Sequence, residues 1–221
     1  MKEFKMRIRN VFQALVLSAA CMAVSGVAVA EDAAPSAQAF VEREHQKLAT
    51  LLKQPASTAR DGQVSHELDA MVDYQELARR AFGEPCPAAI SGCTDHWGEL
   101  KDPQKAEVAD LLKRLVEKNY RKNLVKTLDY EVTFKGQKDT GGGEARIRTE
   151  AKSKLKPRDP AVQVDYVVKN ANGAYHVVDI VTEGSSLTKN YYDQFHKMLT
   201  NPAQGYPHIV KKLNEKLAKP D

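Results

Sequence analysis

Apolar side chains recur at helical spacing in the first half of the chain and again near its end. After Asp102-Pro103, a pair typical of a helix start, Val108, Leu111 and Leu112 begin an apolar stripe opposite a face of lysines. Residues 55–63 lack this spacing and are predicted to be a linker. The predicted helices cover residues 37–52, 65–82, 103–128, 188–199 and 206–217.

The apolar period changes from about 3.6 to two after Leu128. Val132 and Phe134 alternate with polar residues, which indicates a half-buried strand. A turn is predicted over residues 136–143, followed by a second strand over residues 144–152 with a charged solvent face.

Two arms rich in β-branched and aromatic residues then flank Asn172-Gly173, which is a strong hairpin signal. The returning arm, Tyr175–Val181, is apolar on both faces, so we expect both faces to be covered. Helices, then an antiparallel sheet, then helices indicate an α+β fold. We expect one unit over residues 31–221, with a helical part at 37–128, a sheet at 129–184 and C-terminal helices at 187–217.

The first thirty residues are typical of a cleaved signal peptide. Four basic residues precede an apolar run, and Ala28-Val29-Ala30 resembles a cleavage site. Lipidation at Cys21 is one alternative. A membrane anchor is the other, but the apolar run is shorter than the roughly 20 residues that span a bilayer. Removing residues 1–30 removes four of the 33 basic and one of the 29 acidic side chains. The net charge falls from +4 to +1, which gives no argument for nucleic-acid binding.

Cys86 and Cys93 remain after signal cleavage, with six residues between them that include Pro87 and Gly92. In an oxidising compartment this pair is expected to form a disulfide that closes a short loop. A metal site with Asp95 and His96 is the alternative, although structural zinc sites normally have closer cysteines. A catalytic redox pair usually has two intervening residues.

Few residues have a pattern that indicates catalysis. Gly141-Gly142-Gly143 precedes no helix, and the six histidines form no His-Glu-x-x-His pattern, so we predict neither a phosphate loop nor a metal or other cofactor. Ser186 lacks a nucleophile elbow and is predicted to cap a helix. Asp179 lies inside an apolar strand and has two interpretations. It is either a general base or a carboxylate that pairs with Arg146 or Arg148 or caps the next turn.

Two stretches resemble the MlaC family, also called toluene-tolerance auxiliary proteins. The first is MVDYQELARRAFG at residues 71–83, and the second is VDIVTEGSSLTKNYYDQF at residues 178–195. The resemblance implies a curved antiparallel sheet of the cystatin-like, nuclear-transport-factor-like type, joined to a helical subdomain around a hydrophobic pocket. It also implies a periplasmic, non-enzymatic phospholipid carrier that serves an ABC transport system. The partners implied are an inner-membrane ABC permease complex and an outer-membrane lipoprotein–porin complex.

The pocket that the resemblance implies must shield acyl chains from water. Burial of each methylene stabilises the bound lipid by about 0.8 kcal/mol, so two chains of roughly 15 methylenes contribute on the order of 24 kcal/mol. We therefore expect a deep apolar pocket with little head-group chemistry. Its predicted lining is Leu77, Ala81, Leu111 and Leu115 from the helices, with Val132, Phe134, Ile147, Val164, Tyr166, Val178, Ile180, Leu187 and Tyr191 from the sheet side.

Two other functions are compatible with the same pattern. A secreted small-molecule enzyme on a curved-sheet scaffold would use Asp179 or a histidine as its base. A structural adaptor would bind no ligand and would have a filled core.

Overall fold

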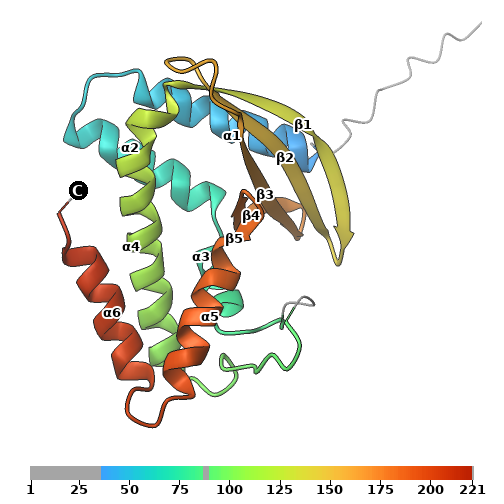
Figure 1. Ribbon diagram of the computed structural model, residues 1–221. Helices are drawn as coiled ribbons and strands as arrows, with labels where there is room; N and C mark the ends of the chain where they lie inside the picture. The colour runs from blue at the N-terminus through green and yellow to red at the C-terminus, as the bar shows by residue number, and fades with distance from the viewer. Residues whose placement is uncertain (1–35, 87–89, 221) are drawn as a thin grey trace, which may run out of the picture. The chain divides into compact units, whose positions relative to one another are not determined.

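The computed structural model describes residues 36–86 and 90–220, with the backbone alone over residues 121–127. Within these ranges the chain forms six α-helices and five β-strands, the α+β fold that the sequence predicts (Figure 1). None of these helices is both long enough and apolar enough to cross a bilayer. The helices are α1 (Ala37–Leu52), α2 (Thr58–Met71), α3 (Tyr74–Ala81), α4 (Asp102–Thr127), α5 (Leu187–Leu199) and α6 (Tyr206–Ala218). The strands are β1 (Tyr130–Gly141), β2 (Glu144–Ser153), β3 (Val162–Ala171), β4 (Ala174–Thr182) and β5 (Ser185–Ser186).

The predicted helix over residues 65–82 is two helices, and the predicted linker over 55–63 is partly helical. Ser57 caps α2 through its Oγ, which accepts a hydrogen bond from the Arg60 N–H at 3.1 Å. Between α2 and α3, Val72 is extended and forms a parallel bridge with Val177 of β4. The Asp73 N–H donates to the Val177 carbonyl at 3.1 Å. Pairing with the distant sheet therefore interrupts a stretch whose local apolar spacing is helical.

The five strands form one antiparallel sheet in sequential order, β1-β2-β3-β4-β5. Asn172 and Gly173 have positive φ, at 54° and 85°, which confirms the predicted tight hairpin between β3 and β4. The predicted turn over residues 136–143 is wrong except at its last two residues, because β1 continues to Gly141 and β2 begins at Glu144. Residues 137–139 have no apolar alternation, and it is the backbone pairing with β2 that keeps them extended.

The helical layer covers one face of the sheet, here called the inner face. The register places Ile147 opposite Tyr166 and Tyr166 opposite Ile180, so these three side chains share that face. Helix α1 packs across β1, β2 and β3, while α3 and α5 pack against β4 (Figure 1). Val177, Val178 and Val181 of β4 are all buried, as expected for a strand that is apolar on both faces.

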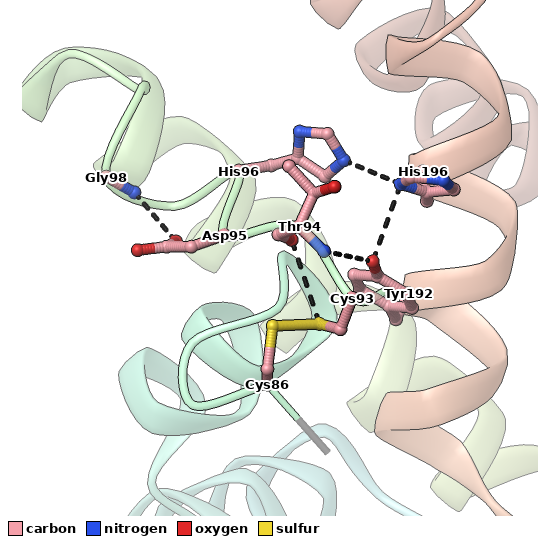
Figure 2. Close-up of a disulfide and its surroundings, with 8 residues drawn as sticks. All are labelled: Cys86, Cys93, Thr94, Asp95, His96, Gly98, Tyr192 and His196. Atoms are coloured by element: carbon pink, nitrogen blue, oxygen red, sulfur yellow. Dashed lines mark hydrogen bonds between the residues drawn. A yellow bond between two sulfur atoms is a disulfide. The ribbon is translucent and has the colours of Figure 1, made fainter. Parts of the chain in front are cut away.

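The segment that follows the disulfide lies against α5 (Figure 2). Cys86 and Cys93 are bonded, which confirms the predicted disulfide. Just after it, the Thr94 N–H donates to the Tyr192 hydroxyl at 2.9 Å, and His96 Nε2 lies 2.8 Å from His196 Nδ1. The alternative of a metal site is not supported. The two sulfurs bind each other, and no group of three potential ligands occurs among the described residues.

Replacing Asp73 tests the junction between α2 and α3. Its Oδ1 accepts a hydrogen bond from the Glu76 N–H at 2.9 Å, so Asp73→Ala should lower the free energy of unfolding by about 1 kcal/mol. The measurement is urea unfolding followed by circular dichroism. Asp110→Ala is the matched control, because Asp110 is exposed and 3.7 Å from Arg114, and we expect a change within about 0.5 kcal/mol. Equal losses in the two variants would contradict the capping role.

Candidate functional site

A cavity of about 340 Å³ lies between α4, the β4–β5 turn and α5, and we call it the α5 cavity. Its apolar part is partly or fully buried, and it consists of Val116, Tyr120, Ile180, Leu187 and Tyr191. The remaining lining residues are polar and exposed, and they are Asn119, Thr182, Ser185 and Asn190. The cavity thus has an apolar floor and a polar rim, the arrangement expected for a ligand with an apolar body and a polar end.

The turn that opens α5 fixes one wall of this cavity. Glu183 and Gly184 have positive φ and reverse the chain after β4. The Ser186 side chain then caps α5 by accepting a hydrogen bond from the Lys189 N–H at 3.0 Å, as the sequence predicts. Leu187, the first residue of α5, is thereby held at the cavity wall.

Asp179 supports the same turn. Its Oδ1 accepts hydrogen bonds from the N–H groups of Ile180 and Thr188, and its Oδ2 accepts one from the Ser186 hydroxyl at 2.6 Å. Of the two interpretations of Asp179, the structure favours the cap. The alternative pairing with Arg146 does not occur, because Arg146 binds Asp165 at 2.6 Å. Asp179 is also not among the described residues that line the α5 cavity.

A second cavity of about 400 Å³, the α1 cavity, lies between α1, the end of α4 and β1. Its described lining is His45, Leu48, Ala49, Leu52, Lys53, Tyr120, Leu128, Tyr130, Glu131, Val132 and Lys154. The His45 ring meets the Phe134 ring edge to face, at 6.3 Å between centroids. Burial lowers the pKa of His45, which favours the neutral imidazole and keeps this wall weakly polar.

Tyr120 lines both cavities and therefore forms part of the wall between them. Burial raises the pKa of Tyr120 well above its usual range, and the proximity of Tyr166 and Tyr74 adds to this effect. The phenol is uncharged at any physiological pH. An uncharged aromatic side chain is therefore shared by the two cavities.

The predicted lining residues fall into three groups. Ile180, Leu187 and Tyr191 line the α5 cavity, and Val132 lines the α1 cavity. Leu115 lines a third cavity near the end of α6, which is described below. The other predicted residues line none of these three cavities, and they are Leu77, Ala81, Leu111, Phe134, Ile147, Val164, Tyr166 and Val178.

Most residues of the last group share the core around the cavities. Leu77, Ala81, Leu111 and Ile147 are buried there, and Phe134 and Tyr166 pack against it. Val178 differs, because the β3–β4 register shifts at this point and Val178 has no paired partner on β3.

Val116 and Tyr120 line the α5 cavity but are not among the lining residues predicted from the sequence. Both belong to the apolar stripe of α4, since Val116 directly follows the predicted Leu115 and Tyr120 lies about one turn further along the helix. The stripe was the available signal. It could not show which of its edges packs against other helices and which borders a space.

The fold and its cavities define a class of protein in which helices cover one face of an open curved sheet and leave apolar space beneath them. A family model described as "MlaC protein" matches residues 42–215, and the chain belongs to the MlaC family. The fold is also similar to that of a phospholipid-binding protein from Ralstonia solanacearum, solved in complex with a phospholipid. The two are 20% identical with a TM-score of 0.66, over 83% of this chain and 97% of the other. No curated protein is significantly similar in sequence.

The half-buried position of His45 predicts a pH dependence of stability. Because its pKa is lowered in the folded protein, the unfolded chain binds a proton at a higher pH than the folded chain does. The free energy of unfolding should therefore decrease as pH falls below about 6.5, the ordinary histidine value. Urea unfolding at pH 7.5 and 5.5 should show a smaller decrease for His45→Phe than for the wild type. The control is His66→Phe, at an exposed position, and it should keep the wild-type decrease. An unchanged pH dependence in His45→Phe would refute this assignment.

Proposed function

We propose that this protein binds phospholipid and carries it through the periplasm, as the soluble component of an ABC transport system. The observation that carries the proposal is the pair of cavities on either side of Tyr120, with apolar floors and exposed polar residues at their edges. Membership in the MlaC family and the phospholipid bound by the Ralstonia protein support it.

The volumes of the cavities suit acyl chains. If a methylene occupies about the volume of a water molecule, a chain of about 15 methylenes fills roughly 450 Å³. Cavities of about 340 and 400 Å³ each approach the volume of one chain, and neither approaches that of two. A lipid with two chains would therefore place one chain in the α5 cavity and one in the α1 cavity, with Tyr120 between them.

The finer parts of the proposal rest on the sequence and on the family. The first thirty residues are typical of a cleaved signal peptide, which would direct the chain to the periplasm. There it would exchange lipid with an inner-membrane ABC permease complex and an outer-membrane lipoprotein–porin complex. The proposal requires no cofactor and no catalytic residue.

The two other functions considered from the sequence receive less support. Of the bases that an enzyme could use, the Asp179 carboxylate accepts hydrogen bonds from Ile180, Ser186 and Thr188 and lines none of the three cavities. His45 does line the α1 cavity, but its ring packs edge to face against Phe134. An adaptor would need a filled core, but two cavities border the central helix α4.

Lipid extraction and mass spectrometry of protein purified from the periplasm test the proposal. We expect co-purified phospholipid in the wild type and a several-fold lower amount in Leu187→Trp, because an indole at position 187 would occupy space in the α5 cavity. Thr133→Trp is the matched control. It adds the same ring at an exposed position of β1, so it should retain full occupancy.

Two outcomes would count against this function. Wild-type protein that carries no phospholipid and takes up none from vesicles would refute it directly. Full occupancy in a folded Leu187→Trp variant would show that the α5 cavity is not the binding site. Circular dichroism of each variant separates loss of binding from loss of folding.

A further inference from the structure

A third cavity, of about 340 Å³, lies between α4, α5 and the end of α6, and we call it the α6 cavity. It shares two lining residues, Asn119 and Tyr191, with the α5 cavity. The Tyr191 ring is buried and therefore forms part of the wall of both spaces. The other described lining residues are Leu115, Lys118, Lys216, Lys219 and Pro220.

The α6 cavity is cationic. Three of its described lining residues are lysines, and its described lining contains no aspartate or glutamate. Lys118 holds the end of α6 against α4, because its Nζ donates to the carbonyl of Leu217 at 2.9 Å and also to that of Lys219. This contact fixes the part of the chain that carries Lys216 and Lys219.

Lys216 is half-buried and lacks an acidic partner among the described residues. Its Nζ donates to the neutral Gln194 Oε1 at 3.1 Å and lies 5.3 Å from the centroid of the Tyr191 ring. Burial lowers the pKa of Lys216, and the nearby charge of Lys219 lowers it further. Two neighbouring lysines, by contrast, do have acidic partners. Lys189 binds Asp193 at 2.7 Å, and Lys212 binds Glu215 at 2.8 Å.

Among the described residues neither of these two ammonium groups, on Lys216 and Lys219, is paired with a carboxylate, so together they would stabilise an anion. A phosphate group satisfies this requirement, because its oxygens accept hydrogen bonds from lysine and carry the opposite charge. The position of this charge next to the polar rim of the α5 cavity matches the geometry of a phospholipid, in which the phosphate lies at one end of the acyl chains.

We propose that the α6 cavity binds the phosphate of a lipid whose acyl chain occupies the α5 cavity, and that Lys216 and Lys219 thereby favour lipids with a net negative charge. This inference rests on the proposed function and adds a head-group preference to it. A zwitterionic lipid has the same phosphate but also a cationic group that the two lysines repel. The head group remains at the surface, where its other polar atoms stay hydrated.

Competition between two lipids tests the preference. The protein is stripped of lipid and incubated with vesicles of phosphatidylglycerol and phosphatidylethanolamine in equal parts, and the bound lipid is quantified by mass spectrometry. Wild-type protein should be enriched in phosphatidylglycerol by about fivefold, the factor expected for one partly exposed charge interaction. The double variant Lys216→Gln/Lys219→Gln should lose the enrichment.

Lys212→Gln is the matched control, because it removes a lysine of the same helix that is already paired with Glu215. It should keep the wild-type enrichment. Equal binding of the two lipids by wild-type protein, or the same enrichment in the double variant, would overturn the head-group inference and leave the carrier function intact. Failure of the wild type to take up either lipid would instead refute the carrier function.

A parallel titration with inorganic phosphate distinguishes a lipid head group from a free anion. It is followed by the side-chain amide signal of Gln194, the residue that Lys216 contacts. Enrichment in phosphatidylglycerol that persists in excess phosphate supports the lipid as the source of the anion. Saturation by micromolar phosphate without any lipid preference would assign the cavity to free phosphate and overturn the proposal.

Discussion

The arrangement of the molecule depends on how β4 holds the helical layer at two of its residues. The Val177 carbonyl accepts a hydrogen bond from the Asp73 N–H, which fixes the start of α3. Two residues later, the Asp179 carboxylate binds the Thr188 N–H and the Ser186 hydroxyl, which fixes the start of α5. Buried backbone and carboxylate groups must be hydrogen-bonded, so these contacts leave little freedom in where the two helices begin. The space beneath them is a consequence of these attachments.

The same attachments explain why the interior is not fully packed. Helices α3 and α5 are tied to β4, whereas α1 packs across β1, β2 and β3. Helix α4 passes between these two groups, and its Tyr120 reaches both of the spaces that remain beside it. A core that is otherwise well filled by Phe82, Phe195 and Leu112 thus coexists with apolar space near the surface. Dense packing around these spaces holds their walls in place.

Local patterns were sufficient to predict much of this fold. The helix over residues 37–52 and the hairpin at Asn172-Gly173 follow from apolar spacing and turn chemistry, and the disulfide follows from compartment and spacing. The break at Val72-Asp73 could not be predicted, because its cause is a bridge to Val177, more than a hundred residues away. The alternation of side chains along β4 predicted the wrong position for Val178 for a similar reason. The register shift between β3 and β4 depends on both strands and cannot be deduced from the sequence of one. For the cavities, periodicity identified apolar faces but not which members of a face border empty space.

The partition of the interior by Tyr120 has an evolutionary consequence. The boundary between the α5 and α1 cavities includes a side chain at the edge of a helical stripe, and the hydrogen bonds of the backbone do not depend on it. A single codon change at this position can join or reshape the two compartments while every helix and strand keeps its place. Diversification of cargo within such a scaffold can therefore proceed by point mutation, without insertion, deletion or a change in topology.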